Sequence, residues 1–358
     1  MDTSLTLTTI NMPHVIENIL ENAGESETEN LQIVIIGDLK TPLEIEDYVK
    51  KVDKSSKAEI VYLSVADQEK LFSKHTNLWN HIPVNSFARR NYADIYAADS
   101  GALRIIRIDD DNFPYEPNFI QKHEVVGSTM NLDTISSSKG WFNVCETLTD
   151  INNVEFYPRG YPVAKRWIDH DINVNKKDVK IGVNAGLWLG DPDVDAFTRL
   201  TRPIDAITYD NKYGDYYALE KGTYCPINTQ NTSYMVELLP TMFVSPFAGR
   251  YDDILSGYFQ RSIMDNFDLS VTYGIPLMKQ DRNPHNIFDD MSKEILGGKC
   301  ADEICKYLQD FKYSGSSIAD CYSELVDQTI KDIDQFPSKD FLLKILEGMK
   351  IWSESFNK

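Results

Sequence analysis

The sequence contains few cysteines and no long apolar run, and both absences exclude whole classes of protein. Its five cysteines are an odd number without a CxxC pair, which fits neither a disulfide framework nor a zinc knuckle. The longest strongly apolar stretches, such as Ile33 to Ile36, are far shorter than the ~20 residues that cross a bilayer. Residues 1–12 have no basic residue before their apolar positions and no small-residue cleavage site. We therefore expect reduced thiols, no membrane span and a cytoplasmic location.

Basic residues are also scarce. The chain has 36 Lys and Arg against 55 Asp and Glu, so its net charge is −19. A chain of this charge repels a polyphosphate backbone, which disfavours nucleic acid polymers as partners but permits a single nucleotide in a pocket. The motifs GxSxG, P-loop, HExxH and GxGxxG are absent from the sequence. Their absence excludes a serine hydrolase, a P-loop NTPase, a zincin and a simple dinucleotide enzyme.

What the sequence does contain is the alternation of strands and helices that is typical of an α/β protein. Leu31 to Ile36 (LQIVII) is a nearly continuous apolar run, as in a parallel strand covered on both faces. A similar strand is expected at Glu59 to Leu63, and Pro42 to Val52 between them fits a crossover helix. These units predict an α/β fold with a doubly wound, mostly parallel sheet, which binds ligands at the carboxyl ends of its strands.

The composition changes along the chain, which suggests a domain boundary. Residues 112–285 are rich in Gly, Pro, Tyr and Asn, so loops and short strands around a site are expected there. From about residue 290, apolar residues such as Leu342, Ile345 and Met349 recur at helical spacing. We predict a catalytic domain over residues 1–285 and a helical appendage over residues 286–358, whose amphipathic helices suggest a homo-oligomer.

The most informative motif is a triplet of acids that directly follows an apolar strand. Leu103 to Ile108 (LRIIRI) runs into Asp109, Asp110 and Asp111, which we call the acidic triplet. Three adjacent carboxylates repel one another, so a cation is expected to offset their charge. Mn2+ or Mg2+ takes oxygen ligands and bridges a protein carboxylate to a diphosphate. The alternative is an acidic turn that is merely solvated.

Four segments resemble, in the same order, motifs of a known family. They are RIIRIDDDNFP (104–114), EFYPRGYP (155–162), VNAGLWLGDP (183–192) and GRYDD (249–253). The family is that of the plant reversibly glycosylated polypeptides, also called UDP-arabinopyranose mutases. GDLKTP (37–42) and QDRNPHN (280–286) are more similar to the related STELLO-type glycosyltransferases. The resemblance covers residues 31 to 290 and implies a GT-A-like fold that binds a nucleoside diphosphate sugar.

The resemblance implies roles for the acidic triplet and its surroundings. Asp109 and Asp111 would contact the metal and the diphosphate, and Asp110 would contact the nucleotide sugar. His285 would complete the metal shell, although a lone histidine is more often a satisfied surface or core residue. Arg282, in the QDRNPHN segment, is predicted to contact the nucleotide sugar as well.

Further candidates follow from the chemistry of single residues. Asp38, after a predicted buried strand, is placed to accept from a nucleotide base, or alternatively to cap a turn. At least one of Arg89 and Arg90 is expected to face the diphosphate or to pair with the acidic triplet, whereas the other can be plain surface. Trp188, among the glycines of VNAGLWLGDP, is predicted to offer a face to the sugar.

Catalytic roles are predicted for a carboxylate pair and one arginine. Asp252 or Asp253, expected in a loop, would take the proton of an acceptor hydroxyl, the alternative being an N-cap or a salt bridge. Arg159 lies between prolines and a glycine, which predicts a rigid, exposed turn. In the family that this segment resembles, the matching arginine accepts the sugar reversibly. The alternative is a diphosphate or carboxylate clamp, because a guanidinium stays protonated at neutral pH.

These features favour a metal-dependent glycosyltransferase that moves a sugar from a nucleoside diphosphate sugar to the hydroxyl of an unknown acceptor. The alternative is a nucleotide-sugar mutase, between pyranose and furanose forms, with reversible self-glycosylation at an arginine. A nucleotidyltransferase normally shows a Gly-rich loop after its first strand, where this chain has TTIN (8–11). A fourth hypothesis, a sugar-nucleotide-binding partner without catalysis, is disfavoured by the intact acidic triplet.

Overall fold

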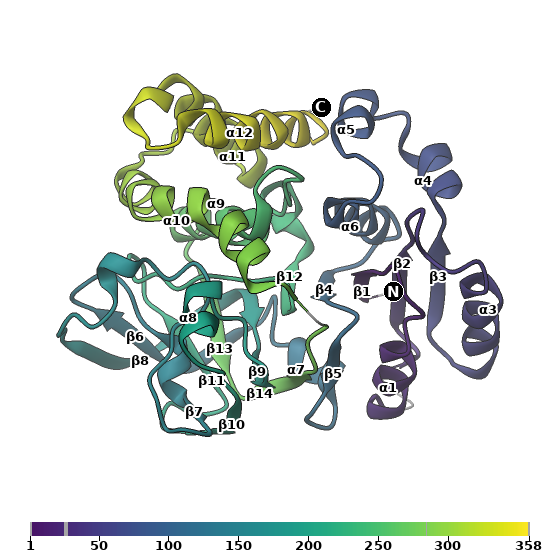
Figure 1. The fold of residues 1–358 in the computed structure, drawn as a ribbon, viewed down its shortest axis with the longest axis horizontal. Helices are drawn as coiled ribbons and strands as arrows, with labels where there is room; N and C mark the ends of the chain where they lie inside the picture. Colours follow the sequence, from purple (N-terminus) through teal and green to yellow (C-terminus); the bar gives the residue numbers. More distant parts are fainter. Residues whose placement is uncertain (1, 25–27, 284, 357–358) are drawn as a thin grey trace.

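The computed structural model describes residues 2–24, 28–283 and 285–356, and its first half is the parallel unit that the sequence predicts (Figure 1). Strands β1 (Thr3–Thr8), β2 (Leu31–Ile36), β3 (Glu59–Leu63) and β4 (Arg104–Ile108) pair in the order β4-β1-β2-β3, all in parallel. Their register brings the carboxyl ends of β1, β2 and β4 to one edge of the sheet. A ligand is expected at this edge.

Helices cover both faces of the parallel half, so it is doubly wound. One face packs against α1 (Val15–Asn22) and α3 (Ile45–Ser55) through alternate residues of β1 and β2. The other face packs in a second buried cluster with α4 (Val65–Phe72), α5 (Thr76–His81) and α6 (Arg90–Asp99). Every residue of β2 is buried, which explains why its sequence is apolar at almost every position.

Beyond β4 the same nine-stranded sheet becomes mixed and continues in the order β12-β8-β6-β11-β13. The strands are β6 (Thr129–Ser137), β8 (Ile172–Ala185), β11 (Tyr216–Leu219), β12 (Asn231–Met235) and β13 (Leu269–Gly274). Strand β12 runs antiparallel to both β4 and β8, whereas β11 and β6 pair in parallel. All strand pairs are therefore parallel only in the half of this sheet that carries the predicted ligand edge.

A second, five-stranded sheet brings a distant segment to the acidic triplet. Its order is β5 (Asn112–Pro114), β14 (Pro276–Gln280), β9 (Leu187–Gly190), β10 (Ala206–Tyr209) and β7 (Leu148–Asp150). Strand β5 follows the triplet directly and pairs with β14. The backbone N–H of Asp281, just after β14, donates to the carbonyl of Asp111 at 3.1 Å. Residues near 280 thus reach the ligand edge although they lie far from it in sequence.

The C-terminal region is helical, as predicted. Its helices α10 (Ile287–Asp310), α11 (Ile318–Lys331) and α12 (Lys339–Glu354) stack with α9 (Asp252–Asn266) above the second half of the sheet (Figure 1). The buried residues of these three helices belong to the same hydrophobic cluster as those of α9. The domain boundary at residue 285 stays a prediction. Two short helices remain, α7 (Phe119–His123) and α8 (Ala196–Thr201).

Helix α9 corrects the expectation of loops and short strands between 112 and 285. It is buried from Asp253 to Met264 without an exposed face. A helix buried all round has no polar stripe, so its sequence lacks the helical period that would have revealed it. Strand β8, with 14 residues, was missed in the same region.

All five cysteines are buried free thiols, as expected. Among the described residues, no helix has the length and apolar character needed to cross a bilayer.

Candidate active site

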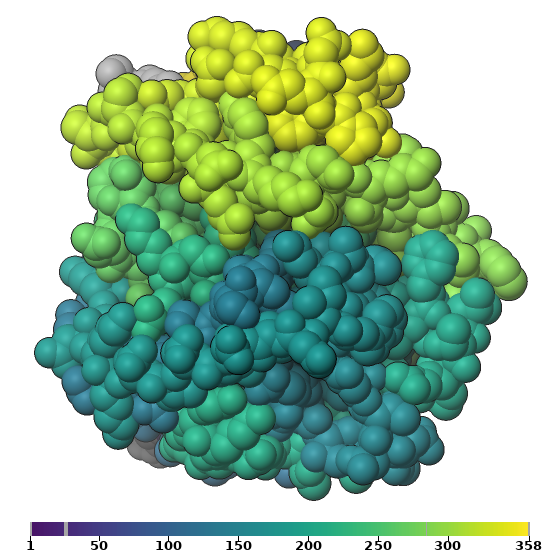
Figure 2. All heavy atoms as spheres, turned by 90° about the vertical axis from the view of Figure 1, so that its left-hand side faces the viewer, coloured from purple at the N-terminus to yellow at the C-terminus, as the bar shows by residue number. Residues whose placement is uncertain are grey.

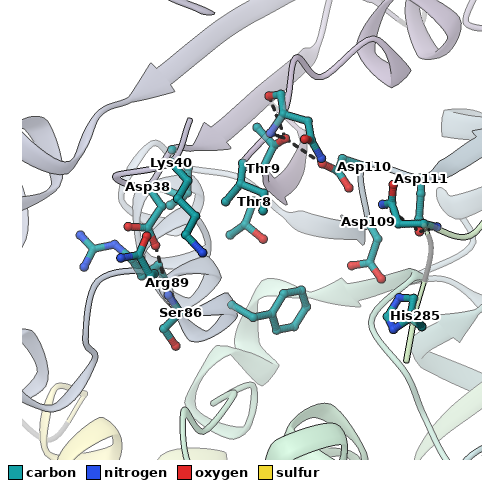
Figure 3. A pocket seen from close by; sticks show the side chains of 17 residues that line it. Thr8, Thr9, Asp38, Lys40, Ser86, Arg89, Asp109, Asp110, Asp111 and His285 are labelled. Atoms are coloured by element: carbon teal, nitrogen blue, oxygen red, sulfur yellow. Dashed lines mark hydrogen bonds between the residues drawn. The ribbon is translucent and has the colours of Figure 1, made fainter. Parts of the chain in front are cut away.

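A pocket of about 570 Å3 opens at the carboxyl edge of β1, β2 and β4 (Figure 3). Residues that follow these three strands form its wall together with residues 85–89 and with Asn283 and His285. In Figure 3, Asp38 and Arg89 lie at one end of the pocket, and the acidic triplet lies with His285 toward the other. The pocket therefore joins the two groups of residues that the sequence assigned to one ligand.

Within the acidic triplet, Asp109 is held by the first residue of α6 and Asp110 by the residue after β1. Asp109 accepts a hydrogen bond from Arg90 Nη2 at 2.8 Å, and Asp110 accepts one from Thr9 Oγ1 at 2.7 Å. Burial raises the pKa of Asp109 to about 6, although Arg90 opposes the shift and the Asp111 carboxylate adds to it. An added positive charge beside Asp109 would relieve this cost.

Asp111 connects the acidic triplet to the segment after β14. It accepts hydrogen bonds from Asn112 Nδ2 at 2.9 Å and from the backbone N–H of Asn283 at 3.3 Å. Burial raises the pKa of Asp111 as well, while the Asn283 N–H and the charge of Arg282 lower it. Asp111 is therefore a partly solvated carboxylate with room for a further ligand.

The structure places His285 in the pocket wall without showing a metal shell around it. Its Nδ1 lies 3.2 Å from Asp290 Oδ2, on the first turn of α10. Among residues 2–24, 28–283 and 285–356, no group of three or more His, Cys, Asp or Glu side chains is arranged to hold a metal ion. The metal role of His285 stays a prediction.

Arg89 and Asp38 form the opposite end of the pocket. The Arg89 side chain is 1% exposed, and its Nε donates to Gln68 Oε1 at 2.8 Å. Gln68 is fixed in turn, because its Nε2 donates to the carbonyls of Gly37 and Leu63, each at 2.8 Å. In the described part of the chain Arg89 Nη2 has no hydrogen-bond partner. The guanidinium carbon lies 5.1 Å from the ring centroid of Trp79, so Arg89 contributes a buried positive charge to this end of the pocket.

Asp38 presents a carboxylate at the same end of the pocket. Its Oδ2 accepts from the backbone N–H of Ser86 at 3.1 Å, and its Oδ1 accepts from its neighbour Leu39 at 2.7 Å. The turn role and the ligand role of Asp38 are therefore compatible, since each carboxylate oxygen can accept a second hydrogen bond.

Arg90 pairs with the acidic triplet, as one of its predicted alternatives stated. The expectation that the other arginine lies on the surface is wrong, because Arg89 and Arg90 are both 1% exposed. Arg90 Nη1 also donates to the hydroxyl of Thr229, so this arginine bridges the pocket and the interior.

Arg159 does not lie in an exposed turn, which corrects that prediction. The side chain is 6% exposed, and Gly160, with φ of +88°, passes so close to α9 that a Cβ there would lie 2.4 Å from Ile254 Cγ2. The prolines and the glycine press this segment against α9 instead of lifting it into solvent.

Two carboxylates and one carbonyl occupy the guanidinium of Arg159. Its Nε and Nη2 each donate to Asp193 at 2.9 Å, and its Nη1 and Nη2 donate to Asp253 at 3.0 and 3.3 Å. Nη1 also donates to the carbonyl of Arg250. Because a guanidinium has five N–H groups, every donor of Arg159 is used. We call Arg159, Asp193, Asp253, Arg250 and Arg282 the buried ion cluster.

Asp252 and Asp253 occupy the first turn of α9, not a loop, and differ sharply. Asp253 is 4% exposed and accepts from Arg159 and from the backbone N–H of Thr229 at 3.1 Å. Asp252 is partly exposed and accepts from the N–H of Asp253 at 3.0 Å. Burial raises the pKa of Asp252 to about 7, with the Asp253 carboxylate adding to the shift and Arg159 opposing it. Asp253 takes the salt-bridge alternative. Asp252 is not among the residues of the pocket wall, and its role as a base stays a prediction.

Two further predicted residues lie outside the pocket wall. Trp188 is 2% exposed, and its Nε1 donates to Gln230 Oε1 at 2.8 Å. It is therefore a core residue that offers no face to a sugar, which corrects the prediction. Arg282 Nη2 lies 3.8 Å from Asp193 Oδ1, so this arginine belongs to the buried ion cluster, beside Asn283 of the pocket wall.

Sequence reasoning missed Gln68, Thr229 and Asp193. Gln68 and Thr229 are single polar residues without a distinctive motif, and only the fold shows what they hold. Asp193 had a signal, because Asp191, Asp193 and Asp195 alternate directly after VNAGLWLG. Such closely spaced acids, in a chain whose arginines are few, would have suggested ion pairs.

Residues 69–358 match the model of the family described as reversibly glycosylated polypeptide. UDP-arabinopyranose mutase 2 of Arabidopsis thaliana is 28% identical over 214 residues, which are 56% of this chain and 54% of that protein. The probable UDP-arabinopyranose mutase 4 of the same plant is 26% identical over 265 residues, 71% of this chain and 67% of that protein. The chain spans about half the length of the first of these relatives.

Solved structures resemble the fold only loosely. S. aureus TarS aligns with a TM-score of 0.37 and 13% identity over 100% of this chain and 56% of that chain. The mannosyltransferase PcManGT from Pyrobaculum calidifontis, in complex with GDP-Man and Mn2+, aligns with a TM-score of 0.34 and 8% identity over 99% of this chain and 86% of that chain.

Proposed function

We propose that this chain, which belongs to the reversibly glycosylated polypeptide family, is a mutase that rearranges the sugar ring of a nucleoside diphosphate sugar. The relatives are named UDP-arabinopyranose mutases, and these names favour the mutase over the glycosyltransferase that the sequence alone put first. A UDP-sugar is the substrate proposed for this chain. Transfer to a separate acceptor is the second candidate.

The observation that carries the proposal is the pocket with two chemically different ends. At one end, the acceptor Asp38 beside the positive charge of Arg89 suits a base edge with an N–H beside a C=O, as on uracil. At the other end, the acidic triplet suits a diphosphate only if a cation lies between them. A nucleoside diphosphate satisfies both ends at once.

The residues present fit a divalent metal ion at the acidic triplet. Asp109 and Asp111 are oxygen donors in the pocket wall, and the raised pKa of Asp109 reflects crowded, partly desolvated carboxylates. Because Mg2+ and Mn2+ commonly keep waters and substrate phosphates in their shell, two carboxylates suffice on the protein side. When bound, such an ion draws negative charge off the diphosphate.

Asp252 is the residue proposed to handle the proton. A ring change forms a bond between C1 and the oxygen of one sugar hydroxyl, which loses its proton. It breaks the bond between C1 and the old ring oxygen, which gains a proton and becomes a hydroxyl. A carboxyl group with a pKa of about 7 does both near neutral pH. Arg90 lies between the two sites, paired with Asp109 and contributing its charge to the environment of Asp252. Arg159 and Asp253 hold the first turn of α9 in place.

The reaction is tested directly by incubating the protein with UDP-arabinopyranose and Mn2+ and separating the sugar nucleotides by chromatography. We expect a furanose product that disappears in Asp111→Asn. Asp340→Asn, on an exposed side chain of α12, is the matched control and should retain activity. Hydrolysis or transfer without any ring isomer would overturn the mutase in favour of the transferase.

Intact-mass measurement separates the two roles proposed for Arg159. Because all its N–H groups are occupied and nearby carboxylates hold the pKa of its guanidinium well above the usual range, we expect no sugar adduct on it. A one-sugar adduct that is lost in Arg159→Lys would show instead that this arginine carries the sugar.

A further inference from the structure

We infer that a second cavity, between the mixed part of the sheet and the C-terminal helices, binds a phosphorylated small molecule. The cavity has a volume of about 530 Å3, and we call it the lysine cavity. Its wall is built from the residues after β6, the residues after β11, helix α9 and the end of α10. Figure 2 shows the side of the molecule on which the yellow-green atoms of the C-terminal region lie directly against the teal atoms of the middle of the chain. The inference does not depend on the proposed mutase reaction.

Three lysines from separate segments line this cavity. Lys139 follows β6, Lys221 follows β11, and Lys312 follows α10. Within the described residues, none of the three forms an ion pair, although the chain has an excess of acids. Some lysines elsewhere pair with a carboxylate, as Lys177 Nζ does at 2.8 Å from Glu220, so what sets these three apart is that they gather around one cavity. Three ammonium groups without partners around one cavity leave a strong preference for an anion.

The one carboxylate that lines the lysine cavity is already neutralised. Asp265 Oδ1 lies 2.9 Å from Arg261 Nη2, and its Oδ2 accepts from the backbone N–H of Gly222 at 3.2 Å. The negative charge of Asp265 is thus compensated by Arg261 and by a backbone N–H group. Lys221 adds its charge to the environment of Asp265, but none of the three lysines forms an ion pair with it in the described structure.

Lys139 is the most enclosed of the three. It is partly buried, and its Nζ lies 5.6 Å from the ring centroid of Tyr161. Burial lowers the pKa of Lys139, although Glu155 and Glu146 oppose the shift at longer range. A partly desolvated ammonium group without a counter-ion costs free energy, which a bound phosphate would offset.

Aromatic side chains give the lysine cavity an apolar wall. Phe311 and Tyr313 stand with ring centroids 4.9 Å apart, and Tyr313 Oη is fixed by Ser262 Oγ at 2.6 Å. Lysines beside aromatic faces suit a phosphate attached to a planar group. We therefore assign the site to a nucleoside monophosphate, with a sugar phosphate as the other source of the same anionic group.

Hydrogen exchange locates the ligand, and calorimetry measures its affinity. With EDTA present, we expect uridine monophosphate to protect residues 138–140, 221–224 and 308–313, and inorganic phosphate to bind more weakly at the same place. Glucose 1-phosphate replaces the nucleotide as a second arm, and tighter binding of it would reassign the ligand to the sugar phosphates. Protection confined to residues 8–11 and 36–40 would place all binding in the nucleotide-sugar pocket and overturn the inference.

Lysine variants test the same site by charge. Lys139→Ala should raise the dissociation constant of uridine monophosphate about tenfold, the loss of affinity expected for one charge-assisted contact. Lys221→Ala with Lys312→Ala should weaken it further without unfolding the protein, because both side chains are exposed. The control removes three exposed lysines elsewhere, at 51, 54 and 344. An equal loss in the control, or unchanged affinity in the double variant, would reduce the binding to unspecific charge and contradict the site.

Discussion

The acidic triplet and the buried ion cluster are built from the same residue types and have opposite relations to their surroundings. In the cluster, Arg159 spends every donor on Asp193, Asp253 and a carbonyl, so its charges are matched within the protein. In the acidic triplet, Asp109 is the one carboxylate that forms an ion pair within the described part of the chain, with Arg90 at 2.8 Å, and all three carboxylates line a pocket. Matched charges hold a structure together, whereas unmatched charges mark the place of a ligand.

The largest expected effect is a loss of stability when one positive charge is removed from the buried ion cluster. Arg159→Met leaves two buried carboxylates without their partner, which should lower the free energy of unfolding by about 3–5 kcal/mol. Denaturant unfolding measures this loss. Arg202→Met, on an exposed side chain, is the control and should cost about 1 kcal/mol or less. Unchanged stability of Arg159→Met would show that the cluster does not hold the fold.

We expect Asp252 to act in catalysis, although it accepts a hydrogen bond from Asp253 of the buried ion cluster. Asp252→Asn should reduce the turnover rate about 10²- to 10⁴-fold, the usual loss for a general base. In the unaltered protein the rate should rise with pH through about 7, because the base must be deprotonated, and this limb should vanish in the variant.

The stability of the same variant should move in the opposite direction from that of Arg159→Met. The folded state holds the Asp252 proton up to about pH 7, whereas the unfolded chain releases it near 3.8. The charged side chain therefore lowers stability as the pH rises between these values, and Asp252→Asn should be at least as stable at pH 8. Full turnover by Asp252→Asn would remove this residue from the mechanism.

A smaller effect is expected at the other end of the pocket. Arg89→Lys keeps the positive charge but loses the Nε hydrogen bond to Gln68 that fixes this end of the pocket, so the affinity for a UDP-sugar should fall about tenfold. Titration calorimetry with UDP measures it. If ribose 5-phosphate, which has no base, lost as much affinity as UDP, Arg89 would not read the base.

The smallest effect on binding is expected at Trp188. Because its indole is buried against Gln230, Trp188→Phe should leave donor affinity within about twofold while it costs about 1–3 kcal/mol of stability through the lost hydrogen bond. A large loss of affinity at unchanged stability would return Trp188 to the sugar site.

The same comparison explains what the sequence could reveal. Asp109 to Asp111 follow an apolar strand whose direction aims them at the ligand edge, so their place follows from local pattern and from the rule for parallel sheets. Asp38 was found in the same way, at a strand end, whereas Arg89 was proposed because an arginine suits contact with a phosphate.

The buried ion cluster could not be predicted in this way. Arg159, Asp193 and Asp253 lie on separate segments, and only the packing of α9 against the loops after residues 155 and 190 brings them together. A short motif shows that Arg159 is constrained, but not whether its guanidinium faces solvent. Helix α9 itself escaped because it is buried on every side.

Calorimetry of UDP with and without Mn2+ tests most directly the claim that the unmatched carboxylates form the ligand site. We expect Mn2+ to tighten binding at least about tenfold in the unaltered protein and in Asp340→Asn, but not in Asp111→Asn, whose free energy of unfolding should be unchanged. Equal affinity with and without Mn2+, or a full metal effect in Asp111→Asn, would contradict it.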